Sequence, residues 1–481
     1  MTGEVVAGVD CSTQQTKVVI VEIDSGAVVG FGSAPHEVTG EDGARETDPV
    51  VWHQALATAL ASTDRAHEVA AISIAGQQHG LVVADVDNEP LRPAILWNDT
   101  RCAAQAERLT ERLGGAAWWA SRIGVVPVPS ITVAKWSWLR ECEPEIARQT
   151  QQVKLPHEWL TSQLTGGSTT DRGDASGTGW WSVIRGEYDE QVLDEVSLDP
   201  SVLPTVLTQA EAGYATPAAA EEFGLRAGTP VAIGTGDNMA AALGLGIDEG
   251  TPVLSLGTSG TAYTVSTSPA SDSSGVVAGF ADATSRYLPL ACTLNCTLAV
   301  DRMARWLGLE REQVSPNTDV IALPYLDGER TPNLPHATGM IVGLRHTTAP
   351  QQILRAMYEG AVASLIDALE AIDEHSSGLR NDASLVLIGG GARGQAWRDV
   401  VRRLSGKPLQ VPADGEFVAL GAAAQAAALV TDEAPLDVAR GWGHGIGEEI
   451  EPLERDDEAL HRISSVRADA DELLNRSDGC S

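Results

Sequence analysis

Short apolar runs alternate with polar turns over the first hundred residues of the chain. Residues 5–10 are apolar, residues 12–15 are polar and residues 17–23 form a β-branched run, which predicts two strands joined by a tight turn. After an Asp-Ser-Gly turn, a third strand is expected at 27–32. A helix is then expected over 51–60, because a capping aspartate and a proline precede its apolar stripe. Two further buried strands are predicted, at 69–75 and 94–97, and strands alternating with helices are typical of an α/β fold.

The second half of the chain repeats this opening pattern. Residues 252–257 form an apolar strand, residues 258–260 a glycine-bearing polar turn and residues 261–266 the returning strand. A long amphipathic helix is expected over 349–371, followed by a buried strand at 384–388. The elements expected next are a helix at 395–404, a strand at 409–411 and a helix at 419–429. Two copies of one α/β unit facing each other would form a cleft, where ligands commonly bind, and chance recurrence of a common pattern is the alternative.

The length of the chain bears on its domain organisation. A chain of 481 residues exceeds the usual size of one hydrophobic core, so we expect two domains, at 1–247 and 248–481. The region 114–211 is rich in tryptophan and is interpreted as an insertion, not as part of the repeat. No apolar run reaches the roughly 18 residues that span a bilayer, and no basic and apolar leader opens the chain. These features predict a cytoplasmic protein.

The charge of the chain is strongly acidic, with 66 acidic against 33 basic residues and a formal net charge of −33. This balance argues against nucleic acid and anionic membranes as partners, because both need clustered Lys and Arg. It leaves room for a small phosphorylated ligand, which needs only backbone N–H groups and a metal ion. The 6 cysteines are scattered without a metal-binding spacing, so free thiols are expected.

Two turns carry residues suited to phosphate. Asp10 ends the first predicted strand and is followed by Ser12 and Thr13, so a carboxylate that can hold Mg²⁺ lies beside phosphate-binding hydroxyls. An ordinary hairpin turn is the alternative for this segment. The equivalent turn of the second half, Gly257-Thr258-Ser259, has small residues that allow a ligand close to the backbone. Neither turn is a Walker A loop.

A third glycine-rich turn and one aspartate follow other predicted strands. The segment 389–391 is three glycines, which allow a flat nucleoside to pass close to the backbone. Asp237 and Asn238 follow a strand at 230–233 and precede a helix. A carboxylate there can accept a proton from a substrate hydroxyl during phosphoryl transfer. A helix N-cap is the alternative interpretation of Asp237.

Two polar segments at strand ends are suited to a polyol. Gln78 and His79 lie in a Gly-Gln-Gln-His-Gly segment, and Asn98 and Asp99 follow a tryptophan at the end of the next strand. Amides, imidazole and carboxylate supply the donors and acceptors that read hydroxyl groups. For His79, a structural role in the core is the alternative.

The order of these segments resembles that of the FGGY carbohydrate kinases, and within that family the xylulokinases. The resemblance runs nearly from end to end. The segments that carry it are 8–10 with Thr13 and Lys17, 74–80, 93–99 with Arg101, 174–178, 236–238, 254–260, 323–326 with 328–332, 389–392 and 419–423.

This resemblance implies a fold and a reaction. The fold is two actin-like, ribonuclease-H-like α/β domains with a central cleft, with the sugar against the first domain and ATP mostly against the second. The reaction is transfer of the ATP γ-phosphate to a ketopentose, D-xylulose to D-xylulose 5-phosphate, with ATP and Mg²⁺ as cofactors. The implied roles are a catalytic base at Asp237, a metal-associated acid at Asp10, phosphate loops at Ser12, Thr13, Gly257, Thr258 and Ser259, an adenosine site at Gly390, Gly391 and Ala392, and sugar contacts at Gln78, His79, Asn98, Asp99, Asp237 and Asn238.

Two positions depart from the family pattern and leave alternatives open. Many members have Gly at the position of Ser12 and Met at that of Gln78, so the exact sugar is less firmly implied than the reaction. The alternatives are a kinase of ribulose, gluconate or glycerol, and a non-catalytic actin- or chaperone-like nucleotide switch. A sugar-responsive DNA-binding regulator lacks the basic segment that it needs. The expected partners are the sugar and ATP alone, and a homodimer stays open.

Overall fold

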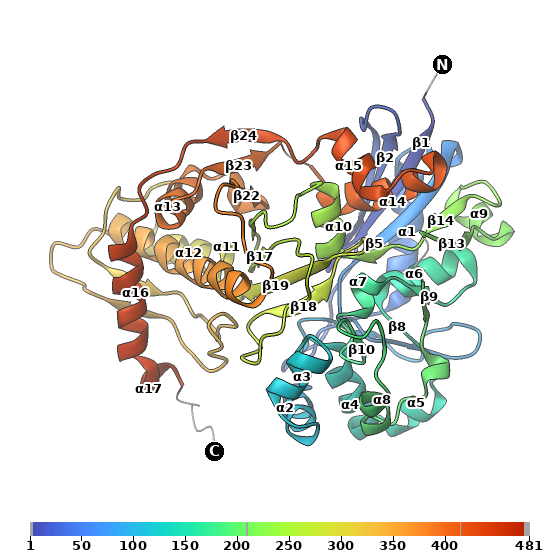
Figure 1. The fold of residues 1–481 in the computed structure, drawn as a ribbon, viewed down its shortest axis with the longest axis horizontal. Coiled ribbons are helices and arrows are strands. Elements are labelled where there is room, and N and C mark those ends of the chain that lie inside the picture. The colour runs from blue at the N-terminus through green and yellow to red at the C-terminus, as the bar shows by residue number, and fades with distance from the viewer. Residues whose placement is uncertain (1–2, 208–209, 414, 476–481) are drawn as a thin grey trace.

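Two sheets, each flanked by helices, form the two lobes of the molecule (Figure 1). The computed structural model describes residues 3–207, 210–413 and 415–475. The chain passes from the first lobe to the second near the middle of the sequence, as the colour change from green to yellow shows in Figure 1.

The first sheet has the strand order β13-β14-β5-β1-β2-β3. Its strands are β1 (Val5–Cys11), β2 (Gln15–Glu22), β3 (Val28–Pro35), β5 (Val69–Gly76), β13 (Glu211–Tyr214) and β14 (Pro230–Ala232), and the short β15 (Thr235–Gly236) pairs with β5. β1 is antiparallel to β2 and β2 to β3, whereas β5 runs parallel to β1 and β14 parallel to β5. The register places Asp10 opposite Lys17. The buried strands thus follow the predicted apolar runs closely.

The second sheet has the order β18-β19-β17-β16-β22-β23-β24. Its strands are β16 (Val253–Leu256), β17 (Gly260–Tyr263), β18 (Ala278–Ala281), β19 (Tyr287–Thr293), β22 (Leu385–Ile388), β23 (Leu409–Pro412) and β24 (Gly447–Ile450). β16 is antiparallel to β17 and β17 to β19, whereas β22 runs parallel to β16 and β23 parallel to β22. Because this is the pairing pattern of β3-β2-β1-β5-β14, the predicted duplication of one α/β unit is confirmed.

The helices cover both sheets and fill the region between the repeats. In the first half they are α1 (Pro49–Ser62), α2 (Ala103–Arg112), α3 (Ala116–Arg122), α4 (Thr132–Cys142), α5 (Pro144–Gln149), α6 (Pro156–Thr165), α7 (Arg172–Ala175), α8 (Glu190–Glu195), α9 (Pro217–Phe223) and α10 (Asp237–Gly244). In the second half they are α11 (Thr297–Leu307), α12 (Pro350–His375), α13 (Gln395–Ser405), α14 (Phe417–Thr431), α15 (Pro435–Trp442), α16 (Asp457–Asp469) and α17 (Asp471–Leu474).

Short strands and 3₁₀ turns complete the fold. The strands are β4 (Glu46–Thr47), β6 (Val82–Ala84), β7 (Ala94–Ile95), β8 (Gln152–Lys154), β9 (Thr169–Thr170), β10 (Trp181–Ser182), β11 (Glu187–Tyr188), β12 (Thr205–Val206), β20 (Ile321–Leu323) and β21 (Met340–Val342), and the turns are Ala66–Glu68, Pro200–Val202 and Gly390–Arg393. The strand expected at 94–97 ends after two residues, because the chain leaves its partner β4 to form the loop of Asp99.

Helix α14 connects the two lobes. It packs against the first sheet, where Ala423 and its neighbours join a buried cluster with Val6 and Val19 (Figure 1). It also lies very close to α10, since a Cβ built on Gly421 would be 1.9 Å from the Ala240 carbonyl oxygen. The segment of α14 therefore packs on the first lobe before the chain goes back to the second with β24 and α16, and the boundary at 247/248 stays a prediction.

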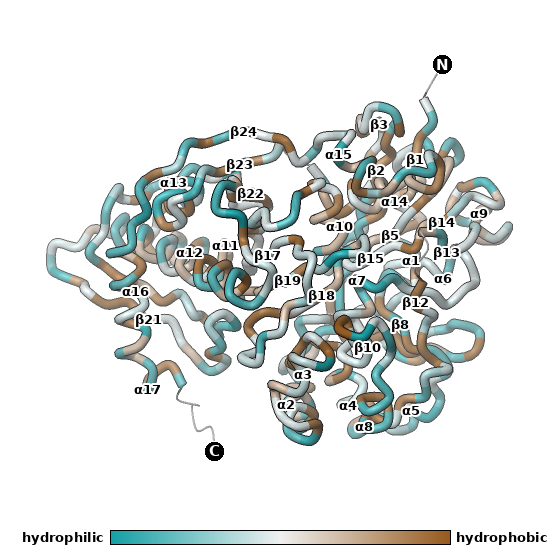
Figure 2. The backbone as a smooth tube through the Cα atoms, viewed as in Figure 1, coloured by the Kyte–Doolittle hydropathy of each residue, from teal (hydrophilic) through white to brown (hydrophobic). Residues whose placement is uncertain are grey.

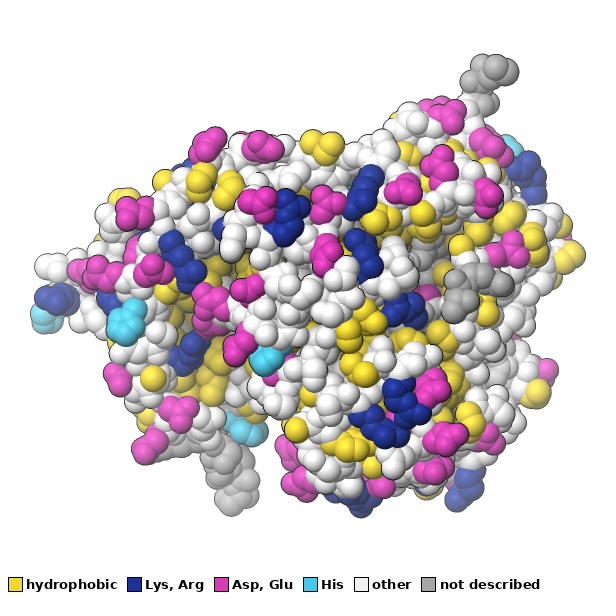
Figure 3. Space-filling model, viewed as in Figure 1, with side chains coloured by type: hydrophobic (Ala, Val, Ile, Leu, Met, Phe, Trp, Pro, Cys, Tyr) yellow, Lys and Arg dark blue, Asp and Glu magenta, His cyan; other side chains and the backbone are white. Residues whose placement is uncertain are grey.

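The pattern of surface and core follows the strands and helices. In Figure 2 the hydrophobic positions are concentrated along the central strands and helices, with hydrophilic positions on the outer loops. In Figure 3 the acidic side chains are spread over the visible face among basic ones, as a solvated acidic surface requires. Among the described helices, none alone has the length and apolar character to cross a membrane, and α14 with α15, bent by 115° between them, meets the criterion only as a pair.

Candidate functional site

Two cavities meet at Asp237, between the lobes. The first, of about 420 Å³, is lined by Gly389, Gly390 and Ala392 and is called here the glycine-side cavity. The second, of about 280 Å³, is lined by Gln78, His79 and the turn Gly257-Thr258-Ser259 and is called the histidine-side cavity. The side chains that line both cavities are Asp237, Asn238 and Ser255. A group held by Asp237 can therefore meet a group arriving from the other cavity.

Asp237 is placed by a strand end and a helix start. Gly236 of β15 pairs with Gly76 of β5, and Asp237 begins α10 directly after it. The N-cap is Gly236, so the interpretation of Asp237 as a simple cap does not describe this helix. One carboxylate oxygen, Oδ1, accepts from the backbone N–H of Asn238 at 2.8 Å and from its side-chain amide at 2.9 Å. Desolvation by the surrounding protein, followed by the charge of Asp10, raises the pKa of Asp237 to about 7.

Asp10 lies at the end of β1 and lines the glycine-side cavity. Its Oδ2 is 3.9 Å from the Nζ of Lys17, which also forms an ion pair with Glu416 from the second lobe. Its Oδ1 is buried and has no hydrogen-bond partner in the part of the chain that the structure describes. Burial raises the pKa of Asp10 to about 7, although Lys17 acts in the opposite direction. A buried carboxylate oxygen without a partner is suited to a cation.

The two predicted phosphate turns are held differently. Ser12 closes the β1–β2 hairpin, because its hydroxyl donates to the Gln15 carbonyl at 2.9 Å. Thr13 lines the histidine-side cavity, and its hydroxyl accepts from the indole N–H of Trp97 at 3.0 Å. The hairpin alternative thus describes Ser12 itself. In the second turn, the carbonyl of Gly257 accepts from the backbone N–H of Thr297 at 3.1 Å and from its hydroxyl at 2.7 Å. The N-terminus of α11 therefore fixes this turn in the cavity.

The glycine turn combines one structural and one open position. Gly389 has φ of 86°, and a Cβ there would be 2.8 Å from the Leu256 carbonyl oxygen. Gly391 is buried against Leu256 as well. A Cβ on Gly390 would meet no described atom within 4 Å, so this residue leaves space on the cavity side. Gly390 and Ala392 line the cavity as predicted, whereas Gly391 packs beneath it.

Cationic side chains also line the glycine-side cavity. They are Lys17, Arg393 and Arg398. Arg398 donates from Nε to the Ala392 carbonyl at 2.6 Å, which ties the glycine turn to α13. Positive charge beside a glycine turn is suited to a phosphate chain.

Gln78 and His79 form one wall of the histidine-side cavity. The Oε1 of Gln78 accepts from the side-chain amide of Asn238 at 3.0 Å, which links this wall to the residue beside Asp237. The Nδ1 of His79 lies 2.9 Å from the Gly177 carbonyl oxygen. Because a carbonyl only accepts, Nδ1 carries the hydrogen. Burial, with Lys135 and Arg330 nearby, lowers the pKa of His79 to about 3, so the ring is neutral and Nε2 is an acceptor.

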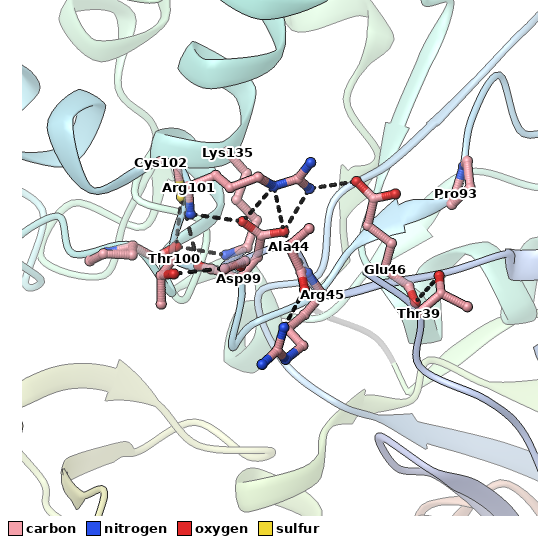
Figure 4. Close-up of polar contacts among 12 residues, drawn as sticks. Thr39, Ala44, Arg45, Glu46, Pro93, Asp99, Thr100, Arg101, Cys102 and Lys135 are labelled. Atoms are coloured by element: carbon pink, nitrogen blue, oxygen red, sulfur yellow. Dashed lines mark hydrogen bonds and ion pairs between the residues drawn. The ribbon is translucent and has the colours of Figure 1, made fainter. Parts of the chain in front are cut away.

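Asp99 has a different environment from the one predicted. Its carboxylate accepts from the guanidinium of Arg101, with Nη2 at 2.6 Å from Oδ2, and from the backbone N–H of Arg45 at 2.9 Å (Figure 4). Figure 4 shows the carboxylate turned toward these two partners. Asp99 is thus engaged in anchoring its loop, and it is Trp97 of the same loop that lines the cavity. Asn98 beside it has a buried Oδ1 without a partner, so its sugar contact stays a prediction.

Several cavity residues were not predicted to have a role. Trp97, Lys17 and Arg330 belong to segments that carry the family resemblance, yet the sequence alone does not indicate what they contact. Phe280 and Glu416 come from strands and loops of the second lobe with no local signal. A side chain that meets its partner across the cleft can be found only once the lobes are placed.

The chain is similar to known proteins over nearly its whole length. The family models for the FGGY carbohydrate kinases match this chain, the N-terminal domain over residues 5–244 and the C-terminal domain over residues 253–430. The chain is 56% identical to a xylulose kinase of Streptomyces rubiginosus, over 99% of this chain and 98% of that protein. It is 55% identical to a xylulose kinase of Streptomyces coelicolor, over 98% of each. Among solved structures, a xylulose kinase from Bifidobacterium adolescentis has a TM-score of 0.85 and 34% identity, covering 97% of this chain and 100% of that one.

Proposed function

The chain belongs to the FGGY family of carbohydrate kinases, and from this premise we propose that it phosphorylates D-xylulose with ATP. The product is D-xylulose 5-phosphate. The observation that supports this proposal most strongly is the position of Asp237, which lines both cavities at their junction. The glycine-side cavity then holds ATP and the histidine-side cavity holds the sugar, with its terminal hydroxyl toward Asp237.

Asp237 acts as the general base in this proposal. Its carboxylate accepts the proton of the C5 hydroxyl as the oxygen attacks the γ-phosphorus and the bond to the β-phosphate oxygen breaks, releasing ADP. A pKa of about 7 suits this task, because a base is most effective when its pKa lies near the working pH. Asn238 holds the carboxylate in place through two hydrogen bonds to Oδ1, so the other oxygen is directed to the substrate.

A kinase of this family requires ATP and a divalent cation, and we propose that the cation is Mg²⁺. The unpartnered Oδ1 of Asp10 is the group that fits it, since Mg²⁺ is commonly held by one or two carboxylates and by substrate phosphates. Among the described residues there is no group of three or more acidic, histidine or cysteine side chains that could hold a metal ion, so phosphate oxygens and water would complete the shell. A cation bound there would neutralise the negative charge that develops on the transferred phosphate.

The two lobes contribute different parts of the phosphate site. The turn Gly257-Thr258-Ser259 comes from the second lobe and Thr13 from the first, and both line the histidine-side cavity close to Asp237. Groups fixed on both sides of the cleft can orient the γ-phosphate toward the acceptor and keep water out, which limits wasteful hydrolysis of ATP. We place this reaction in the cytoplasm, where ATP is available.

The test of the proposed function is a substrate panel. ATP consumption is followed by coupled detection of ADP with D-xylulose, D-ribulose, D-gluconate and glycerol, and the product is identified by its phosphate resonance. The proposal expects the highest kcat/KM with D-xylulose. A clearly higher value with another polyol would assign a different substrate to the same site. Slow ATP turnover without stimulation by any sugar would support a nucleotide switch and contradict a kinase.

A further inference from the structure

Arg330 of the second lobe reaches the sugar side of the cleft. It follows Glu329 in the loop after β20, and its Nη1 donates to the hydroxyl of Ser130 in the first lobe at 3.0 Å. Arg330 and Ser130 both line the histidine-side cavity. Among the described residues that line this cavity, Arg330 is the one with a positively charged side chain.

Ser130, which accepts the hydrogen bond from Arg330, lies in a buried loop that is held by further hydrogen bonds. Ser130 is buried at 7% exposure, at the end of the loop that precedes α4. Lys135 of α4 is fully buried, and its ammonium group donates to the backbone carbonyls of Pro129 and Ser130. These hydrogen bonds hold the loop against α4. The hydroxyl of Ser130 therefore presents a fixed acceptor to the arriving guanidinium.

The other end of Arg330 is tied to the second phosphate turn. The carboxylate of Glu329 accepts from the backbone N–H groups of Arg330 at 2.8 Å and of Leu294 at 2.5 Å. Leu294 leads directly into α11, whose first residue Thr297 donates to the Gly257 carbonyl. Arg330 is thus connected to the turn Gly257-Thr258-Ser259 through the Glu329 carboxylate, the backbone from Leu294 to Thr297 and the hydrogen bond to Gly257. The guanidinium and the turn therefore belong to one hydrogen-bonded unit of the second lobe.

Arg330 and His79 offer complementary groups to a polyol. The guanidinium has only donors, and one of its N–H groups is engaged by Ser130. The neutral ring of His79 offers an acceptor at Nε2, because its Nδ1–H is directed to the Gly177 carbonyl. Since the C5 hydroxyl lies at Asp237, where the cavities join, the remaining carbons of the sugar extend into the cavity that these two residues line.

We propose that Arg330 is a sugar-positioning residue, which donates a hydrogen bond to an oxygen of the ketopentose and reaches it only when the two lobes are together. The inference rests on the proposed function and deepens it. The second lobe then contributes to sugar recognition as well as to ATP binding, and the residue that it contributes is connected to its phosphate turn. A bound sugar would stabilise the arrangement of the lobes in which transfer takes place.

The test replaces Arg330 in the full-length enzyme. Arg330→Met is expected to raise the KM for D-xylulose about 10- to 100-fold, the loss that corresponds to a hydrogen bond from a charged group, with the KM for ATP changed less than about threefold. Arg330→Lys keeps the charge without the planar fork and should restore part of the affinity. Arg302→Met, at an exposed arginine of α11 in the same lobe, is the matched control and should leave both KM values unchanged.

Ser130→Ala separates a sugar contact from a clamp between the lobes. This variant removes the acceptor from Arg330 but leaves the guanidinium at the cavity, so its KM for D-xylulose should rise much less than that of Arg330→Met. An equal rise in both variants would show that Arg330 only clamps the lobes and would overturn the inference. Unchanged KM for D-xylulose in both Arg330→Met and Arg330→Lys would overturn it as well. If the wild-type enzyme consumes no ATP with D-xylulose, the proposed function fails, whatever the variants do.

Discussion

Two pairs of acids near the same strand ends have different environments. The inner acids, Asp171 and Asp174, are enclosed by protein, and the cleft acids, Asp10 and Asp237, face a cavity. Asp171 accepts from the backbone N–H groups of Gly173 and Asp174 and from the hydroxyl of Thr235 at 2.7 Å. Asp174 lies 2.6 Å from the Nδ1 of His157.

The surroundings of these acids account for their different roles. The inner acids use neighbouring protein groups, and they hold β15 and the ring of His157 behind the site. Among the described residues, the buried Oδ1 of Asp10 has no hydrogen-bond partner, which is also true of the Oδ1 of Asp174, and the Oδ1 of Asp237 accepts from Asn238. Burial raises the pKa of both cleft acids to about 7, and it also raises the pKa of Asp171, to about 6, and that of Asp174. The two pairs differ in access: Asp10 and Asp237 line a cavity that a substrate or a metal ion can enter, whereas Asp171 and Asp174 are enclosed by protein and support the fold.

The largest effect is expected at a cleft acid. Asp237→Asn removes the proton acceptor but keeps the shape of the side chain, so kcat with D-xylulose should fall by roughly two orders of magnitude or more. Sugar binding, measured by calorimetry, should stay within about threefold, because an amide retains the hydrogen bonds to the neighbours. Near-normal turnover would remove Asp237 from the role of the base.

The second-largest effect is expected at the inner acid Asp174, where a substitution should lower the stability of the fold. Asp174→Ala leaves the buried His157 without its partner, so the free energy of unfolding should fall by about 3–5 kcal/mol. Urea denaturation measures this change. Asp199→Ala, at an exposed aspartate that caps a 3₁₀ turn, is the matched control and should lower the free energy of unfolding much less. Similar losses in the two variants would mean that the inner pair does not support the fold as described.

Gly389 and Gly390 show the same contrast between a packed and a cavity-facing position in the glycine-side cavity. Gly390→Ala adds a methyl group that meets no atom of the described residues within 4 Å, so it should raise the KM for ATP about tenfold without lowering the melting temperature. Gly389→Ala places its methyl group against the Leu256 carbonyl at a φ of 86° and should lower the melting temperature. If Gly390→Ala left the KM for ATP unchanged, the turn would not lie against the nucleotide.

The smallest effect is expected in the pH dependence. Asp237 must be ionised to accept a proton, so kcat/KM should fall as the pH decreases through about 7, the raised pKa of this carboxyl. The charge of Asp10 contributes to that raised value, and a bound cation would compensate it. The decline of kcat at saturating magnesium and ATP should therefore lie at lower pH than the decline of kcat/KM. A pH profile of both constants checks the order, and the reverse order would contradict it.

Much of the fold could be predicted because its signals are local. Apolar runs bounded by glycine and polar turns mark β1, β5, β16 and β22, and the repeated hairpin indicated the duplication. Asp10 and Asp237 could be placed at the cleft for the same reason, since Asp10 lies near the end of the buried strand β1 and Asp237 follows β15 directly, while their roles stay predictions. Strand ends of parallel neighbours meet at one edge of a sheet, so residues at such positions converge in space.

The remaining features depend on contacts that no local pattern reveals. Asp99 has the same sequence signal as a cavity residue, yet Arg101, two positions later, takes up its carboxylate. Gly391 has the same signal as Gly390 but packs against Leu256. The contact between Arg330 and Ser130 joins residues 200 positions apart, so its existence depends on how the two lobes are placed.

The central claim is that Asp237 lies where the sugar hydroxyl meets the last phosphate of ATP. A crystal structure with D-xylulose and a non-hydrolysable ATP analogue tests it most directly. The account predicts a carboxylate oxygen of Asp237 at about 2.6–3.2 Å from the C5 hydroxyl, with the nucleotide along the glycine turn. A sugar bound with its C5 hydroxyl away from Asp237, or a nucleotide outside the glycine-side cavity, would contradict it.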